Sequence, residues 1–380
     1  MKFVIAPDSF KGGLTAKEAA EVIKAGFQRV FPKAEYTLIP MADGGEGTVQ
    51  SLVDATAGQL ITTKVHNPLN QLVDAQYGIL GDQQTAVIEM AQASGLQFVN
   101  RQTANPLVTT TYGTGELILD ALNHQVQKII IGLGGSATTD GGAGMAQALG
   151  AQLLDKDGHE ISLGGGALNQ LVTIKLDHLD PRLKTTTIQI ASDVTNPLTG
   201  KNGAAAVFGP QKGATPMMIT TLDTNLHHYA TVIKQFSGVD IEQIPGAGAA
   251  GGLGAGLLAF TQAKMARGIE LVIQATHLQE KARGADFVIT GEGGIDFQTK
   301  FGKTPLGVAK ATKAVAPYAP VIVLAGNVGK GVDSLYSPDG IDAIFATPAS
   351  AKNLNQALKD ATNDIAQTAE NVARLIKATR

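Results

Sequence analysis

Five short segments of this chain combine glycines with hydroxyl and carboxylate side chains, and each follows an apolar run. They are residues 6–13, 40–47, 132–144, 192–200 and 290–296. Ligands of open parallel α/β sheets bind at the carboxyl ends of strands, where these segments are expected to lie. Glycine lets backbone N–H groups close on an anion, and carboxylates supply oxygen ligands for a hard cation. Together these residue types predict a site for phosphate and magnesium.

The composition excludes several classes of protein. The chain has 380 residues, 44% of them hydrophobic, which is enough for more than one core. Its formal charge is −3 and no run of lysine or arginine stands out, so we expect no nucleic-acid partner. The absence of cysteine excludes disulfides, thiol catalysis and thiolate-bound metals, and favours a cytoplasmic protein.

Targeting and membrane segments are not expected either. An uninterrupted run of only four apolar residues, 3–6, precedes Pro7, which is too short for the core of a signal peptide. Residues 243–263 are uncharged, but glycine and alanine dominate them, which favours a close-packed buried helix over a membrane span. We therefore expect small-molecule substrates and no membrane association. The sequence gives no indication of an oligomer.

Short strands and helices alternate along most of the chain. The strand candidates are residues 2–6, 35–40, 128–131, 187–191, 286–290, 321–325 and 341–346. Helical patterns follow several of them, which predicts βαβ units and a mostly parallel sheet. The first helix begins with a capping-box pattern from Thr15 to Glu18. Residues 61–90 differ, because Thr, Val, Gln and Tyr alternate there between turn signals, as in an antiparallel insertion.

These elements predict an α/β fold with two domains. A discontinuous, Rossmann-like parallel α/β domain would comprise residues 1–62 and 286–380. An inserted α+β domain would comprise residues 63–285. The last segment of the chain has Ile365 and Val372 on one face, and we expect it to form a terminal helix that packs on the first domain.

The glycine-rich segment 132–144 has three interpretations. Its start, Gly132 to Ala137, follows a strand and has Asp155 at the end of the next apolar stretch, as in a dinucleotide-binding fingerprint. That predicts an NAD(P)-dependent oxidoreductase of a small hydroxy acid. Asp140, however, would repel a pyrophosphate unless a cation intervened, so these residues fit a phosphate with its metal better. A turn that only allows tight strand–helix packing is the third interpretation.

Two other segments contain phosphate-like signals of lower specificity. Residues 246–256 also match the fingerprint, but no clear strand precedes them, so close helix packing and a loop at the phosphates stay equally open. Gly302-Lys303-Thr304 is not a P-loop, because the required earlier glycine would fall at Phe297. Lys303 would still reach a phosphate as a point charge, or it is an ordinary surface lysine.

The neighbouring residues indicate which carboxylates could bind a ligand. Asp193 follows an expected strand, and Asp43 and Glu46 lie in a glycine-rich turn before a helix. Asp8 lies in a similar turn with Ser9 and Lys11. A single aspartate in such a turn is often a helix cap or an Asx turn. Several of them at successive strand ends fit a ligand site better.

The strings that carry these residues, in this order, make the whole chain resemble the type I glycerate kinase family. They are APDSFKGGLTA, PMADGGEGT, GLGGSATTDGGAG, SDVTNPL, FGPQKGA, GAGAAGGLGAG and GEGGIDFQTKFGKTPLGVA. The resemblance implies ATP-dependent, Mg²⁺-assisted phosphorylation of D-glycerate in the cytoplasm, with 2-phosphoglycerate favoured over 3-phosphoglycerate. One position departs from the family, which commonly has Arg where this chain has Gly294. If the family's Arg clamps phosphate or carboxylate, Lys300 or Lys303 would take over that role here, or the site would be arranged differently.

The resemblance also gives the polar residues expected roles in phosphoryl transfer. Asp193 would be the base or a metal ligand, and Asp43 and Lys11 would join it at the reacting groups. The expected metal ligands are Asp43, Glu46, Asp140 and Asp193. The expected substrate- and phosphate-binding residues are Ser9, Gly134, Gly135, Ser136, Lys212, Gly251, Gly252 and Lys303. A module that binds a hydroxy acid or a nucleotide without catalysis is a further alternative, since it would share this site but need no base.

Overall fold

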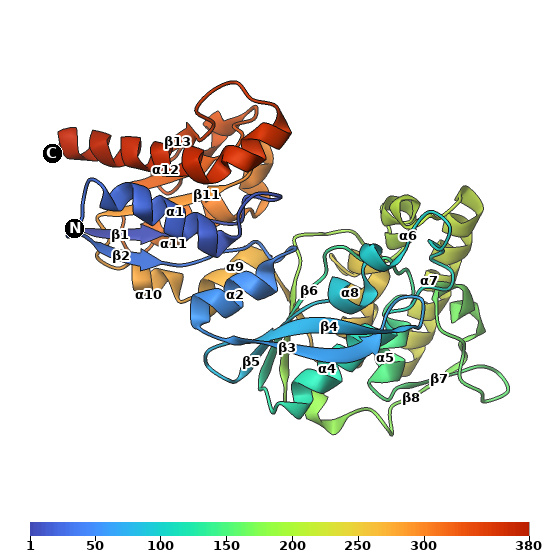
Figure 1. Cartoon of the computed structure of the whole chain (residues 1–380). Helices are drawn as coiled ribbons and strands as arrows, with labels where there is room; N and C mark the ends of the chain where they lie inside the picture. The colour runs from blue at the N-terminus through green and yellow to red at the C-terminus, as the bar shows by residue number, and fades with distance from the viewer. Residues whose placement is uncertain (380) are drawn as a thin grey trace. The chain divides into compact units, whose positions relative to one another are not determined.

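A computed structural model describes residues 1–379, and the chain divides into two compact units. The first unit comprises Met1–Gly58 and the segment from Arg267 onward, and the second comprises Gln59–Ala266. The division expected from the sequence differs at two boundaries, because residues 59–62 lie in the second unit and residues 267–285 lie in the first. Both units mix helices with sheets, which confirms the expected α/β class (Figure 1).

The first unit is built on a five-stranded sheet in the order β13-β12-β11-β1-β2. The strands are β1 (Lys2–Ile5), β2 (Glu35–Leu38), β11 (Phe287–Glu292), β12 (Val321–Ala325) and β13 (Ala343–Ala346). Every neighbouring pair is parallel, as the sequence predicted for these segments. All five strands therefore end at one edge, and the loops that follow them gather there.

Helices cover this sheet. They are α1 (Ala16–Gln28), α2 (Thr48–Thr56), α9 (Gly268–Ala275), α10 (Leu278–Ala282), α11 (Thr304–Lys313) and α12 (Leu354–Ala378). Two of them, α1 and α12, begin at a side-chain cap. The predicted capping box at Thr15 is confirmed. Ile365 and Val372 of the terminal helix α12 are buried in one core with Phe3 and Ile23, as expected. Helices α1 and α12 touch closely, because a Cβ on Gly26 would lie 2.6 Å from the carbonyl oxygen of Ala366.

The second unit has a six-stranded mixed sheet in the order β10-β9-β6-β5-β4-β3. The strands are β3 (Gln59–His66), β4 (Leu72–Ile79), β5 (Thr85–Glu89), β6 (Lys128–Gly132), β9 (Thr187–Ala191) and β10 (Lys264–Ala266). Strands β3, β4 and β5 pair antiparallel, which confirms the antiparallel segment expected at residues 61–90. The remaining pairs are parallel, so β5, β6 and β9 end at one edge. A separate two-stranded ribbon joins β7 (Gln152–Leu154) and β8 (Thr173–Lys175).

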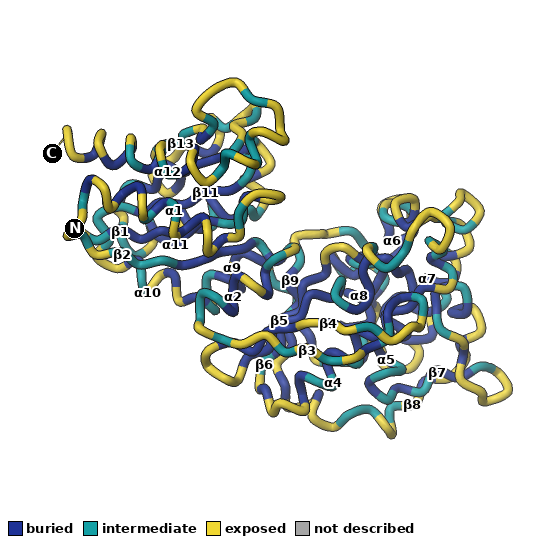
Figure 2. The backbone as a smooth tube through the Cα atoms, viewed as in Figure 1, coloured by how far each residue is buried: buried dark blue, intermediate teal, exposed yellow. Residues whose placement is uncertain are grey.

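The helices of the second unit enclose two apolar cores. Figure 2 colours much of the backbone of this unit as buried. The helices are α3 (Ala91–Ser94), α4 (Tyr112–Asn123), α5 (Ala143–Ala148), α6 (Ala204–Phe208), α7 (Pro216–Ser237) and α8 (Ala249–Phe260). Helix α8 is the glycine- and alanine-rich segment, and it is almost entirely buried, as expected. Within residues 1–379, no helix is long and apolar enough to cross a membrane.

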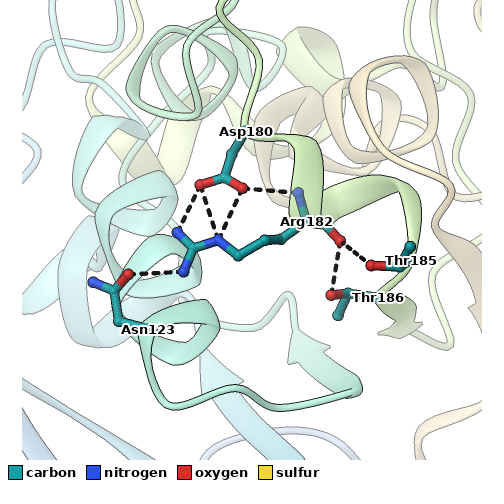
Figure 3. A network of polar contacts seen from close by, with 5 residues as sticks. All are labelled: Asn123, Asp180, Arg182, Thr185 and Thr186. Atoms are coloured by element: carbon teal, nitrogen blue, oxygen red, sulfur yellow. Dashed lines mark hydrogen bonds and ion pairs between the residues drawn. The ribbon is translucent and has the colours of Figure 1, made fainter.

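A polar network lies at the edge of this sheet where β6 and β9 begin (Figure 3). The guanidinium of Arg182 donates to Asp180 at 2.7 Å and to the side-chain oxygen of Asn123 at 2.9 Å. The hydroxyls of Thr185 and Thr186 donate to the carbonyl oxygen of Arg182. Because Asp180 neutralises the arginine, this network ties α4 to the start of β9 and leaves no free charge for a ligand.

Candidate functional site

Carboxylates at the ends of three neighbouring strands line one pocket of the first unit. Asp8 follows β1, Asp43 follows β2, and Glu292 is the last residue of β11. The pocket has a volume of about 350 Å³. Its other polar lining residues are Ser9, Lys11, Lys303, Asn327, Thr347 and Asp364. We call this cavity the carboxylate pocket. It places Ser9, Lys11, Asp43 and Lys303 of the expected site residues together.

Asp8 is held in place by short hydrogen bonds. Its two carboxylate oxygens accept from the backbone N–H of Ser9 and from the hydroxyl of Thr304, both at 2.6 Å. Burial raises the pKa of Asp8 to about 6, and the nearby charge of Asp43 also pushes it upward, while both hydrogen bonds oppose the rise. This carboxyl group therefore gains and loses its proton close to neutral pH.

Glu292 is even more perturbed. Only 9% of this residue is exposed, and burial raises the pKa of its carboxyl group to about 7. The charges of Asp8 and Asp43 push this pKa in the same direction, whereas the ammonium group of Lys303, at 3.9 Å, lowers it. Perturbed acids gathered in one cavity are typical of catalytic and binding sites.

Lys303 is the cation that faces these acids. It precedes α11, and its Nζ donates to the carbonyl oxygen of Gly294 at 3.4 Å. Lys300 instead lies with its Nζ 5.0 Å from the centre of the Phe301 ring, outside the carboxylate pocket. A Cβ on Gly294 would come no nearer than 4.0 Å to Asn327, so the backbone leaves room for a side chain there. Of the two lysines considered for this position, Lys303 is the one at the pocket.

Asp43 and Glu46 share the turn between β2 and α2. The backbone N–H of Gly45 donates to Asp43 at 3.0 Å, so this aspartate also forms the Asx turn considered from the sequence. Glu46 is exposed, whereas Asp43 is half-buried and lines the carboxylate pocket. Among the described residues, no three side chains of the His, Cys, Asp and Glu types are arranged to hold a metal ion.

In the second unit, the loop after β6 is held by a buried lysine. The Nζ of Lys212 donates to the carbonyl oxygen of Thr138 at 2.5 Å and to the hydroxyl of Ser136 at 3.2 Å. Lys212 is only 2% exposed, and burial lowers its pKa to about 7. The structure thus brings two expected phosphate-binding residues together, with Lys212 beneath the loop rather than on its surface.

Asp140 lies at the base of the same loop and is fully buried. Its carboxylate accepts from the backbone N–H and the hydroxyl of Thr111, both at 2.8 Å, and from the N–H groups of Gly142 and Gly144. Burial raises the pKa of Asp140, and these hydrogen bonds oppose the rise. Surrounded by donors from its own unit, Asp140 organises the loop, and its expected metal contact stays a prediction.

The expected glycines differ in their surroundings. Gly134 and Gly135 are exposed where β6 ends, and Gly135 has a φ of +74°. Gly251 and Gly252 are buried, and a Cβ on Gly251 would lie 1.9 Å from the carbonyl oxygen of Thr138. Close packing therefore explains why glycine is needed at position 251, whereas Gly134 and Gly135 present their backbone to solvent.

The surroundings of Asp193 and Asp155 bear on two interpretations of the glycine-rich segment 132–144, the phosphate-and-metal site and the dinucleotide-binding fingerprint. Asp193 is exposed just after β9, which pairs with β6, so it shares a sheet edge with the glycine-rich loop. Asp155 lies in an exposed turn and accepts from the N–H groups of Asp157 and His159, both at 2.9 Å. It closes that turn, as expected of a local cap rather than a ribose ligand. The dinucleotide interpretation is not supported.

Two further residues of the site were not selected from the sequence. Glu292 ends a strand in the segment 290–296, and Thr304 starts the next helix. The signal for Glu292 was present, because that segment was recognised as a strand end rich in glycine and acids. The contact from Thr304 to Asp8 joins residues 296 positions apart, and no local pattern predicts it.

Comparisons with known proteins agree with the resemblance found in the motifs. The profile of the glycerate kinase family matches residues 3–377. The chain is 54% identical to a glycerate kinase of Halalkalibacterium halodurans, with 97% of both chains covered, and 52% identical to glycerate 2-kinase of Escherichia coli, with 98% and 97% covered. A crystal structure from Salmonella typhimurium LT2, provisionally assigned as glycerate kinase 2, aligns with a TM-score of 0.92 at 51% identity, over 100% of this chain and 99% of that one. This chain belongs to the glycerate kinase family, whose members are phosphotransferases with an alcohol group as acceptor.

Proposed function

We propose that this protein transfers the γ-phosphoryl group of ATP to D-glycerate, assisted by Mg²⁺. The observation that carries the proposal is the carboxylate pocket, in which acids and lysines meet at the carboxyl edge of a parallel sheet. Glycerate is small and carries one carboxylate and two hydroxyls. Lys11 and Lys303 offer cations for the carboxylate, and Asp8 and Glu292 offer acceptors for the hydroxyls.

The reaction needs three contributions from the protein: alignment, charge neutralisation and a proton acceptor. The glycerate hydroxyl oxygen forms a bond to the γ-phosphorus, the bond from that phosphorus to the ADP oxygen breaks, and the hydroxyl proton moves to a carboxylate. We propose Asp193 as that carboxylate, with Lys11 and Asp43 at the reacting groups. Asp8 and Glu292 are the alternative acceptors, since their pKa values of about 6 and 7 suit proton transfer near neutral pH.

Mg²⁺ would need only one or two carboxylates from this protein. Mg²⁺ keeps several waters and takes one or two carboxylates together with substrate phosphates, rather than a complete protein cage. Asp43, Glu46 and Asp193 are the accessible candidates among the expected ligands, whereas Asp140 is enclosed by donors. The ion would neutralise charge on the phosphates, and the protein residues would hold the glycerate.

We further propose that the product is 2-phosphoglycerate. A relative that is 52% identical over 98% of this chain is described as glycerate 2-kinase. The choice between the two hydroxyls depends on where the glycerate carboxylate is anchored, because a misplacement of about 1 Å costs on the order of a hundredfold in rate. We propose a cytoplasmic location for this reaction, with ATP and glycerate as its partners.

A coupled assay of ADP release tests the proposal. We expect ADP with D-glycerate, much less with L-glycerate or glycerol, and none in excess chelator, because the metal carries part of the charge stabilisation. Glycerate binding without ADP release would indicate the noncatalytic module instead. Tight NADH binding without ATP binding would restore the oxidoreductase alternative.

A further inference from the structure

A second cavity of the first unit has more cationic than acidic side chains in its lining. It has a volume of about 380 Å³ and lies among α9, α10 and the start of α11. Its charged lining residues are Arg267, Lys300, Lys303, Lys310 and Glu270, and apolar residues such as Ile269, Ile273 and Leu306 complete its walls. We call it the cationic pocket. Four positive groups against one negative group make it a site for an anion rather than for a metal.

Three of these cations have no ion-pair partner. Within residues 1–379, no carboxylate lies within 4.0 Å of Arg267, Lys300 or Lys310. By contrast, Lys313, on the same helix as Lys310, contacts Asp342 at 2.8 Å. Unpaired cations around one cavity create a positive potential that concentrates multiply charged anions. Lys300 lies over the ring of Phe301 and Lys310 interacts at longer range with Asp339, so an incoming anion would displace no contacting carboxylate from these three cations.

The start of α11 adds to this positive field. This helix has 10 residues, and the side chain of Lys303, which precedes it, accepts no hydrogen bond from its first turn. Pro305 has no N–H, so Thr304 and Leu306 supply the N–H groups of that turn, and helix N-termini favour phosphates because such groups point outward. The helix dipole thus adds to the positive potential of the three cations.

Lys303 belongs to both cavities. It lines the carboxylate pocket, where its Nζ lies 3.9 Å from Glu292, and it also lines the cationic pocket. Phosphoryl transfer needs the donor phosphate and the acceptor hydroxyl in contact, with a cation near the group in transit. A lysine in the wall between an acid-rich and a cation-rich cavity meets that requirement.

We infer that the cationic pocket binds the phosphate chain of the nucleotide, while the carboxylate pocket holds the hydroxy acid. This inference rests on the proposed function and deepens it by assigning the two substrates to separate cavities of one unit. Arg267, Lys300 and Lys310 bind the phosphates that stay on the nucleotide, and Lys303 contacts the phosphate that is transferred.

A binding measurement with a charge-reversed pocket tests this assignment. The variant Lys300→Glu/Lys310→Glu is titrated calorimetrically with a nonhydrolysable ATP analogue and Mg²⁺. We expect its Kd to rise at least about tenfold, because each lost phosphate contact and each new repulsion weakens binding. The KM for D-glycerate should change less than about twofold. Lys33→Glu, an exposed lysine of the same unit outside both pockets, is the matched control and should leave the Kd unchanged.

The outcomes separate the inference from the proposed function. An unchanged Kd in the double variant, with a wild-type protein that releases ADP, overturns the inference and leaves the function standing. No ADP release from the wild type overturns the function, while the titration still decides whether nucleotides use this pocket. If the charge-reversed protein does not fold, Lys300→Gln/Lys310→Gln gives the same readout, with an expected rise of about threefold. An equal rise in Lys33→Glu would indicate a general charge effect and would also overturn the inference.

Discussion

At the scale of single residues, surroundings rather than residue types distinguish the acids of this protein. Asp8 and Glu292 share one pocket, and burial raises the pKa of both toward neutrality. Asp140 is also an acid in a glycine-rich segment, yet donors of its own unit enclose it. The sequence selected Asp140 and passed over Glu292, because burial and long-range contacts cannot be read from a strand-end pattern. It did place Ser9, Lys11, Asp43 and Lys303 at ligand positions, and all four line one pocket.

The proposed catalytic roles predict a loss of activity without a loss of stability. Asp193→Asn and Lys11→Ala should each lower kcat at least about a hundredfold, as for a general base or an electrostatic contact. Both residues are exposed, so the thermal midpoint should stay within about 2 °C of the wild type. Steady-state kinetics and thermal melts measure the two effects. Near-normal turnover in a destabilised variant would reassign that residue to structure.

Glu292 predicts a pH dependence of stability with a definite sign. Its pKa in the folded protein is about 7, above the usual 4.5, so the folded state binds the proton more tightly. The resulting stabilisation is complete below pH 4.5 and is lost as the pH rises to 7, by up to about 3 kcal/mol. We expect Glu292→Gln to flatten the fall in thermal midpoint across this window. Parallel curves for variant and wild type would show that Glu292 does not titrate there.

At the scale of elements, strand ends and close glycine contacts position the site. The strands and the capping box were predictable because their signals are local, in apolar runs and in Thr15 with Glu18. The contact that explains Gly251 was not predictable, because it meets Thr138, in a loop far earlier in the chain. The sequence left helix packing and a phosphate loop equally open there, since both need glycine.

The close contact of Gly251 predicts that alanine at this position destabilises the protein, and Gly200 provides a control without such a contact. In Gly251→Ala the new Cβ would overlap the carbonyl oxygen of Thr138, and the φ of +70° adds backbone strain. We expect a loss of at least about 2 kcal/mol in the free energy of unfolding. Gly200 has a similar φ of +84°, but a Cβ added there would have no atom within 4 Å, so Gly200→Ala should cost only about 1 kcal/mol. Equal losses in denaturant titrations would mean that the contact with Thr138 adds nothing.

At the scale of the whole molecule, the chain is a pair of α/β units whose parallel strands end in polar loops. The sequence predicted this class, because alternating strand and helix patterns extend over most of the 380 residues. The sequence assigned the segment 267–285, which forms α9 and α10, to the inserted domain. Their packing against α2 and α11 places them in the first unit. Long-range packing of this kind has no local signature.

The most direct test of the central claim is an enolase-coupled assay with ATP, Mg²⁺ and D-glycerate, run without phosphoglycerate mutase. Enolase accepts only the 2-phosphate, so a signal requires the right acceptor, the right donor and the right hydroxyl together. We expect a full signal without mutase. Because enolase itself needs Mg²⁺, the metal requirement is measured separately, by chromatographic separation of ADP from ATP after incubation with and without chelator. A signal that appears only after mutase is added would show that the product is 3-phosphoglycerate. No signal under either condition would contradict the proposed reaction itself.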